Sequence, residues 1–300
     1  MIAVTVLMAE YNTSPENLRT SIGSMLRQTF TDFEFLIVDD GSATDVRRIA
    51  SEFDDPRLSV ISYGSDRENR GFAAALNHGL SAANGEFIAR IDPDDWVSPE
   101  YLATLHAFMT DHPEYAVASA CAVEFSSSMP AIQIGRDGEK TSRDVMRGSA
   151  PIHAASMMRR SDIETVGGYP DRHRAEDLAL WCELLLAGRR LYVIPAVLYH
   201  YRVEAQDLRK RRLGNRGGEL AVRIHYYRRL GAGPLEYLRI LRSVLSGVLP
   251  QRAVRGARYI LWRSRSRLRD AQLLRGAPRK DETVHPGDEV RERQGGVDQP

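Results

Sequence analysis

The sequence is poor in cysteine and has no long apolar run. Its two cysteines, Cys121 and Cys182, are far apart and form no CxxC pair. This argues against a disulfide scaffold or a zinc site and suits a reducing cytosol. No stretch reaches the roughly 18 consecutive apolar residues that a membrane-spanning helix needs. The N-terminus, Met1 to Val4, lacks a basic region, so we expect no signal peptide.

Glycine is missing where two common nucleotide-binding folds require it. The apolar run from Ile2 to Ala9 predicts a buried parallel strand, and Glu10-Tyr11-Asn12-Thr13 follows it. A dinucleotide-binding Rossmann domain would need G-x-G-x-x-G at this place, and a P-loop would need G-x-x-x-x-G-K-[ST]. If a diphosphate binds beside this strand, a metal ion and arginine must hold it instead.

Charge is distributed unevenly along the 300 residues, although the net charge is only +1. Residues 1–207 hold 19 basic and 31 acidic residues, whereas residues 208–275 hold 18 basic and three acidic ones. An acidic body with a basic extension predicts a cation or small-molecule site in the first part and an anionic surface as partner of the second. The last residues, 277–300, have almost no large apolar group, and we expect them to be disordered.

Apolar runs and helical patterns alternate through the first 111 residues. Strands are predicted at 2–9, 33–38, 58–62 and 87–91, and helices at 14–28, 44–53, 71–83 and 98–111. This order predicts an α/β fold with a doubly wound, mostly parallel sheet. Further on, the sequence predicts a strand at 116–125, a mobile polar loop at 126–147 and an amphipathic helix at 178–187.

Polar side chains follow the ends of three predicted strands, at 10–12, 39–40 and 92–95. Parallel strands bring these ends to one edge of the sheet, where ligands of such folds bind. Asp92, Asp94 and Asp95 stand within four residues and repel one another, and a divalent cation bound to phosphate would relieve that repulsion. The alternative is a solvated acidic turn that caps the next helix.

The motifs at these strand ends resemble those of the family-2 glycosyltransferases, enzymes of the GT-A fold that move a sugar from a nucleotide-diphosphate donor to an acceptor. The resemblance covers about residues 1–203 and keeps the family's order and approximate spacing. The matching pieces are Tyr11-Asn12, Gln28-Thr29-Phe30, Asp39-Asp40-Gly41-Ser42, Asn69-Arg70-Gly71, Gly85 to Asp95 and Glu176-Asp177.

The resemblance implies a role for each donor-side residue. Asp40 is expected at the nucleotide base, Asp92 near the ribose and the metal, and Asp94 on the metal that bridges the diphosphate. Asp95 is an additional metal candidate, for which a helix-start acid is the alternative. The remaining donor-binding candidates are Ala9, Tyr11, Asn12 and Arg70, and a surface charge is the alternative for Arg70.

The resemblance also implies the catalytic groups. Asp177 matches the general base that takes the proton of the acceptor hydroxyl during a single, inverting displacement. Without the resemblance, an acid at a helix start would be read as a partner of the helix macrodipole. Supporting candidates are Glu176, His153, which is equally interpreted as structural, and Trp181, for which core packing is the alternative.

One position departs from the family pattern. Members often carry a histidine near the metal, two residues after a Tyr-Arg pair, and here Glu204 occupies that position after Tyr201-Arg202. Either Glu204 substitutes for the histidine, or His200 serves as the ligand, or this ligand is absent. The cofactor expected from the resemblance is a divalent cation, Mn²⁺ or Mg²⁺.

These inferences divide the chain into a GT-A catalytic domain at 1–205, a basic helical extension at 206–276 and the tail at 277–300. Within the catalytic domain, 1–111 would bind the nucleotide sugar and 112–205 the acceptor. Basic amphipathic helices, here within 208–275, fit anionic membrane surfaces, and a helical cap packed on the domain is the alternative. Nucleic acid is disfavoured because no recognition module accompanies the charge.

The sequence thus predicts a metal-dependent, inverting glycosyltransferase, with a UDP-sugar as favoured donor and a lipid-linked or cell-surface glycan as acceptor. It would be a cytoplasmic enzyme, peripheral at the inner face of the plasma membrane. One rival is an inactive relative that binds nucleotide sugar or membrane. The other is a nucleotidyltransferase, which would need a basic phosphate-binding loop after the first strand.

Overall fold

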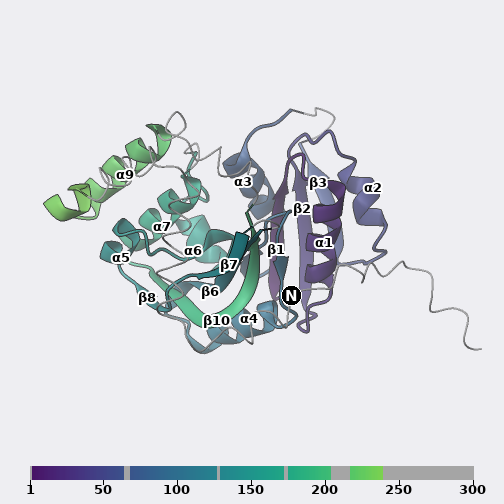
Figure 1. Ribbon diagram of the computed structural model, residues 1–300, viewed down its shortest axis with the longest axis horizontal. Coiled ribbons are helices and arrows are strands. Elements are labelled where there is room, and N and C mark those ends of the chain that lie inside the picture. Colours follow the sequence, from purple (N-terminus) through teal and green to yellow (C-terminus); the bar gives the residue numbers. More distant parts are fainter. Residues whose placement is uncertain (1, 64–67, 127–128, 172–174, 204–216, 239–300) are drawn as a thin grey trace, which may run out of the picture.

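The computed structural model describes residues 2–63, 68–126, 129–171, 175–203 and 217–238 (Figure 1). Its strands are β1 (Val4–Glu10), β2 (Phe33–Asp39), β3 (Leu58–Ser62), β4 (Phe87–Arg90), β5 (Trp96–Val97), β6 (Tyr115–Ser126), β7 (Met129–Ile134), β8 (Gly138–Lys140), β9 (Ser156–Arg159) and β10 (Arg190–Arg202). Its helices are α1 (Pro15–Leu26), α2 (Val46–Ser51), α3 (Phe72–Ala82), α4 (Tyr101–Asp111), α5 (Ser142–Met146), the 3₁₀ turn η1 (His153–Ala155), α6 (Arg160–Thr165), α7 (Glu176–Leu186) and α9 (Gly217–Arg229).

The strands form one sheet in the order β3-β2-β1-β4-β9-β6-β10-β5, with β7 beside β6 and β8 beside β10. The N-terminal four strands β1 to β4 are parallel, and so is the long pairing of β6 with the curved strand β10 (Figure 1). β9 runs antiparallel between β4 and β6. The strand order reverses at β1, and folds of this kind bind ligands at the carboxyl ends of the strands beside such a reversal, here β1, β2 and β4.

Helices cover both faces of the sheet and create two cores. On one face α1, α2 and α4 pack on side chains such as Val6 and Phe35. On the other face α3, α6 and α7 pack on the alternate side chains, such as Leu7 and Leu36. This alternation follows from the two-residue period of a strand, which sends neighbouring side chains to opposite faces. Buried apolar runs on both faces therefore fix the register of the central strands.

The predicted elements of the first 111 residues are present with small shifts. Ser14 caps α1 as expected, and its Oγ accepts a hydrogen bond from the Asn17 backbone N–H. The predicted helix start at Ser98 is wrong, because α4 begins at Tyr101. The Ser98 backbone N–H instead donates to the Leu198 carbonyl, beside the β5–β10 pairing. This tertiary pairing keeps the segment extended.

The predicted mobile loop at 126–147 is also wrong. The described part of this segment holds β7, β8 and α5, with β7 paired to β6 and β8 paired to β10. The sheet is mixed as a consequence, while its longest pairings remain parallel. Strand partners far away in sequence, rather than local apolar patterning, determine these short strands.

The described part of the basic extension is α9 and the residues up to 238. α9 packs against α7 and α5: Arg229 pairs with Glu183 at 2.7 Å, and the Tyr227 hydroxyl donates to the Met146 carbonyl. Within the described ranges, no helix is long and apolar enough to cross a membrane. Glu204, most of the basic extension and the tail from 239 onward lie outside the described residues.

Candidate active site

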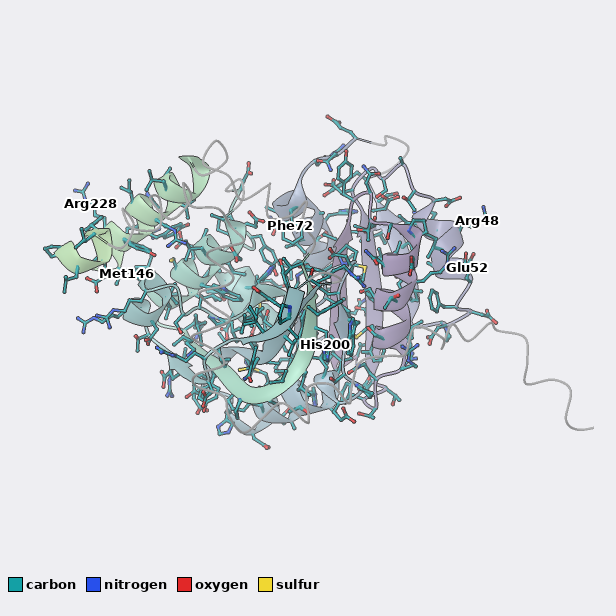
Figure 2. All side chains as sticks on the ribbon, in the orientation of Figure 1. Arg48, Glu52, Phe72, Met146, His200 and Arg228 are labelled. Atoms are coloured by element: carbon teal, nitrogen blue, oxygen red, sulfur yellow. The ribbon has the colours of Figure 1, made fainter. Side chains whose placement is uncertain are left out.

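The polar strand ends meet at one edge of the sheet, as the parallel order of β1, β2 and β4 requires. Glu10 and Asp39 are register partners at the ends of β1 and β2. Figure 2 shows Phe72, at the start of α3, and His200, near the end of β10, over the middle of the molecule, away from Arg48 on the α2 side and Arg228 on the α9 side. The candidate residues follow from this edge outward.

Asp40 is buried where β2 meets the start of α3. Its Oδ1 accepts the Arg70 backbone N–H at 2.8 Å and its Oδ2 accepts the Gly71 N–H at 3.0 Å. Gly71 has a φ of +93°, a conformation that favours glycine, and α3 follows it directly. The carboxylate is thus held in place by backbone donors from another loop. The Arg70 guanidinium lies 4.6 Å from the centre of the Tyr63 ring.

The loop after β1 is tied to the loop after β2. The Asn12 backbone N–H donates to Ser42 Oγ, and the Asn12 side-chain oxygen accepts the Ala43 N–H at 2.7 Å. These bonds leave the Tyr11 ring 52% exposed beside Asp40's loop, so it is accessible to a ligand. Ala9 is only 7% exposed and belongs to the core, where its small side chain leaves room at the strand end.

Asp92 is oriented by a buried arginine. Arg90 is fully buried, and its guanidinium contacts Asp92 Oδ1 at 2.7 Å while the Asp92 side chain stays 25% exposed. Burial raises the pKa of Asp92, and the Arg90 charge opposes that rise. The Asp92 carbonyl also accepts a hydrogen bond from Ser21 Oγ. One carboxylate oxygen is therefore fixed inside the protein and the group remains accessible at the edge.

Asp95 braces the acidic turn against β10. It is 1% exposed, its Oδ2 accepts the Tyr199 hydroxyl at 2.7 Å, and its Oδ1 accepts the Arg202 backbone N–H at 2.7 Å. The Tyr199 oxygen in turn accepts the Asp92 N–H, and Arg202 Nε donates to the Asp94 carbonyl at 2.9 Å. Asp95 precedes β5 rather than a helix, so its interpretation as a helix-start acid does not hold. Both of its oxygens are engaged with β10.

The acidic edge fits a cation that arrives together with phosphate. Glu10 is fully buried, and its Oε2 has no hydrogen-bond partner among the described residues. Burial raises the pKa of Glu10, and the charges of Asp39 and Asp94 raise it further. No group of three or more His, Cys, Asp or Glu side chains in the described ranges could hold a metal alone. Magnesium-type sites with one or two carboxylates complete their shell with phosphate and water.

Asp177 and Glu176 form the first turn of α7. Asp177 is exposed, and its Oδ1 accepts the Leu178 backbone N–H at 2.6 Å, whereas Glu176 is half-buried. The negative charges of both residues act on the buried Tyr169, whose pKa is raised mainly by burial. Tyr169 in turn contacts His153, which opens the turn η1 directly before β9, and β9 pairs with β4. Tyr169 therefore lies between the acidic turn and the start of α7, close enough for the charges of Asp92 and Asp177 both to act on it.

The two supporting side chains beside Asp177 are packed inside. His153 Nε2 lies 3.0 Å from the Tyr169 hydroxyl, and burial, aided by the charge of Arg90, lowers its pKa well below the ordinary value. His153 is thus neutral at physiological pH and engaged within the protein. Trp181 is 1% exposed and packs edge-on against His153, so core packing rather than sugar stacking describes it.

His200 takes part in an aromatic stack. Its ring lies parallel to that of Trp96 with centres 3.3 Å apart, and burial lowers its pKa to about 4. The choice between Glu204 and His200 stays a prediction, because Glu204 lies outside the described residues.

Sequence reasoning missed three residues of this edge, Tyr63, Arg90 and Tyr199, and it named Glu10 only as part of a polar strand end. Arg90 could have been noticed, because an arginine inside the apolar run Phe87 to Ile91 must find a buried partner. Glu10 carried a similar signal at the end of a fully apolar strand. Tyr199 carried none, since a tyrosine in a strand is ordinary and the partners of its hydroxyl come from a distant segment. Tyr63 carried none either, because it merely follows a short strand.

Comparison with known proteins matches this geometry. The model of "Glycosyl transferase family 2" matches residues 5–167, and that of "Glycosyl transferase family group 2" matches residues 87–262. EpsE of Bacillus subtilis (strain 168), which carries a glycosyltransferase assignment, is 30% identical over 82% of this chain and 90% of EpsE. An Escherichia coli UDP-Gal:alpha-D-GlcNAc-diphosphoundecaprenol beta-1,3-galactosyltransferase is 29% identical over 75% of this chain and 83% of its own length.

The fold has solved counterparts as well. The mannosyltransferase PcManGT from Pyrobaculum calidifontis, in complex with GDP-Man and Mn²⁺, superposes with a TM-score of 0.61 at 22% identity, over 91% of this chain and 78% of that one. At this identity the likeness shows the shared fold. With the family match over more than half of the chain and the EpsE similarity, the conclusion is that this chain belongs to glycosyltransferase family 2 and is a glycosyltransferase enzyme.

Proposed function

We propose that the enzyme transfers a sugar from a nucleoside-diphosphate donor to an acceptor hydroxyl by a single displacement that inverts the anomeric carbon. The observation that carries this proposal is the edge itself. It holds the oriented carboxylate of Asp92, the braced turn of Asp94 and, across the sheet, the exposed carboxylate of Asp177. Within the described residues, no Ser-His-Asp or Cys-His arrangement suggests an enzyme nucleophile, and a single displacement needs none.

On the donor side, the loops after β1 and β2 hold the nucleoside, with Tyr11, Asn12, Asp40 and Arg70 around it. Asp92 and Asp94 are the residues that would hold a divalent cation, Mn²⁺ or Mg²⁺, and Asp95 positions their turn. When bound with the diphosphate, the cation would neutralise the negative charge of the leaving group. Glu10 Oε2 has no hydrogen-bond partner among the described residues, and burial with the charges of Asp39 and Asp94 raises the pKa of Glu10, so a cation at this edge would stabilise its ionised form.

On the acceptor side, Asp177 takes the proton of the attacking hydroxyl. Its place in the first turn of α7 stabilises the carboxylate form through the helix dipole, and its exposure allows an acceptor to reach it. Glu176 is half-buried in the same turn and supports the position of α7. His153 and Trp181 complete the packing behind this turn and do not exchange protons with the acceptor.

Replacement of Asp177 by Asn tests the mechanism. A general base contributes about 100- to 10,000-fold to the rate, so kcat should fall by that factor. The affinity for a nucleoside diphosphate in the presence of Mn²⁺ should change by less than about twofold, because the base does not contact the donor in this proposal. Glu176→Gln is the matched control in the same turn and should keep most activity. Undiminished transfer by Asp177→Asn in a donor-consumption assay would remove this residue from the chemistry.

The proposed donor is a UDP-sugar, and the proposed acceptor is a lipid-linked or cell-surface glycan. The support is the similarity to an enzyme named for UDP-Gal and a diphosphoundecaprenol-linked acceptor. A screen of UDP-, GDP- and dTDP-sugars against transfer to a lipid diphosphate sugar tests both parts of this proposal. Transfer only to water-soluble acceptors would contradict the lipid-linked part.

We also propose that the extension places the enzyme at the cytoplasmic face of the plasma membrane as a peripheral protein. Among the described residues, five large apolar side chains are exposed, and four of them lie in the extension: Ile224, Leu235, Tyr237 and Leu238. The basic excess of residues 208–275 complements anionic headgroups. Apolar side chains flanked by arginine are typical of helices that lie in the lipid interface.

Vesicle sedimentation with the full-length protein tests this contact. The double variant Leu235→Ser and Leu238→Ser should bind vesicles of anionic lipid at least tenfold more weakly, because each leucine contributes about 1.5–3 kcal/mol when buried. Tyr11→Ser is the control, since it removes the remaining exposed apolar side chain but lies at the catalytic edge. Equal vesicle binding by all three proteins would exclude this part of the extension from the contact.

A further inference from the structure

Tyr63 lies at the same edge as the donor-side residues, although no sequence motif includes it. It directly follows β3, whose last residue, Ser62, is the register partner of Asp39 at the end of β2. The Tyr63 hydroxyl is buried and has no hydrogen-bond partner among the described residues. A buried hydroxyl costs free energy when it remains unpaired, so its presence at a binding edge requires an explanation.

The Tyr63 ring is held in place by its neighbours. The Arg70 guanidinium lies 4.6 Å from the ring centre, and the His78 ring centre lies 4.7 Å away at an angle of 31°. Arg70 also donates its backbone N–H to Asp40, so one residue fixes both the tyrosine ring and the carboxylate. Arg70 therefore helps to position both groups, of which the hydroxyl is a donor and the carboxylate an acceptor.

The chemistry of each group at neutral pH is defined. Burial, with the nearby charge of Asp40, raises the pKa of Tyr63 to about 12, so the hydroxyl keeps its proton and donates. Asp40 already accepts two backbone N–H groups, one on each oxygen. Each carboxylate oxygen has a second lone pair, which leaves Asp40 able to accept from a ligand as well.

This pair is complementary to one class of nucleobase. Uracil and thymine present a ring N–H beside a carbonyl oxygen, and guanine does so too. Cytosine and adenine present the reverse order, a bare ring nitrogen beside an amino group. A carboxylate would repel the bare ring nitrogen, and a hydroxyl proton would face the amino hydrogens. Sites built to hydrogen-bond one polar pattern discriminate strongly against a ligand that lacks it.

We propose that Tyr63 is a specificity-determining residue that recognises the nucleobase of the donor. Its hydroxyl donates to a ring carbonyl while Asp40 accepts the adjacent ring N–H, so the site selects a keto base (uracil, thymine or guanine) over an amino base (cytosine or adenine). The inference rests on the proposed nucleoside-diphosphate donor. It adds to that proposal the hydrogen-bond pattern of the donor's nucleobase, and it names the residue that recognises this pattern.

Titration calorimetry of the full-length protein with UDP, CDP, GDP and ADP, in the presence of Mn²⁺, tests the inference. The wild-type protein should prefer the keto member of each pair, UDP over CDP or GDP over ADP. Tyr63→Phe keeps the ring and its contacts with Arg70 and His78 but lacks the hydroxyl. It should lower the affinity for the preferred keto nucleotide about fivefold, as for one hydrogen bond of about 1 kcal/mol, with little change for the amino nucleotide.

Tyr115→Phe is the matched control, because it removes a tyrosine hydroxyl that bonds to Arg190 and Glu139 on a different part of the sheet. It should leave all four affinities unchanged. An unchanged keto-to-amino ratio in Tyr63→Phe, or a wild-type preference for CDP or ADP, overturns the inference and leaves the proposed function intact. A wild-type protein that binds none of the four nucleotides overturns both.

Discussion

The donor edge and the start of α7 are held in different ways. At the donor edge, the carboxylates of Asp40 and Asp95 accept hydrogen bonds from separate segments, and that of Asp92 is held by the buried Arg90. At the start of α7, Asp177 is exposed, and its Oδ1 accepts the backbone N–H of its own neighbour, Leu178. Under the proposed mechanism, donor binding would therefore depend on a rigid frame, whereas proton removal would depend on one accessible group. The two functions should therefore respond separately to substitution.

The largest expected effect comes from Asp94→Ala. Loss of a cation ligand should weaken donor affinity in Mn²⁺ by roughly 100-fold or more, since even outer groups of metal sites contribute 10- to 100-fold. Affinity measured with a chelator should change little. Asp111→Ala, at the exposed end of α4, is the control. If chelation leaves the wild-type affinity unaltered, Asp94 has no role with a cation and the donor edge works through arginine alone.

Tyr199→Phe should affect both stability and donor binding. The substitution removes the hydroxyl that joins Asp95 Oδ2 to the Asp92 N–H and leaves a buried carboxylate oxygen without its partner. We expect a loss of about 1–3 kcal/mol in the free energy of unfolding and a several-fold loss of Mn²⁺-dependent donor affinity.

Tyr101→Phe is the comparison that separates these two effects of Tyr199→Phe. Tyr101 is also fully buried, but its hydroxyl donates to the Arg90 and Ser156 carbonyls rather than to the acidic turn. Tyr101→Phe should lose stability but keep more donor affinity than Tyr199→Phe does. Urea unfolding measures the stability, and calorimetry measures the donor affinity. Identical donor affinities in both variants would show that the hydrogen bonds of Tyr199 do not shape the acidic turn.

The last prediction concerns acid stability in the second half of the chain. Burial lowers the pKa of His200 to about 4, so the unfolded chain binds a proton at higher pH than the folded one. The corresponding stability is complete above the ordinary histidine pKa of about 6.5 and is lost as the pH falls toward 4, by up to roughly 3 kcal/mol. His200→Phe retains an aromatic ring against Trp96 and removes this titration.

Urea unfolding at pH 7 and at pH 4.5 measures the effect. The wild-type protein should lose more stability between these two pH values than His200→Phe does. His153, whose pKa is also lowered, contributes acid sensitivity to both proteins. Parallel losses in the two proteins would show that His200 is not buried as a neutral ring.

Local sequence was sufficient for the strands and helices of the first 111 residues, apart from the start of α4. Strands such as β2 were predicted within one residue of their observed bounds, because a buried parallel strand needs a continuous apolar run. The segment 126–147 was misjudged, since β7 and β8 are short and owe their form to their pairing with β6 and β10. The roles of Asp95 and Trp181 also required the fold, because each depends on what packs around it.

The sequence by itself determined the family, the α/β order and the gathering of acidic strand ends at one edge, since strand polarity follows from chain order. Only the tertiary structure decided which carboxylates are exposed and which are braces. Asp94 and Asp95 are neighbours in sequence, yet Asp95 is buried against Tyr199 and Arg202 while Asp94 stays at the surface of the turn. Burial and hydrogen-bond partners come from β10, about 100 residues away, and nothing in the local sequence encodes them.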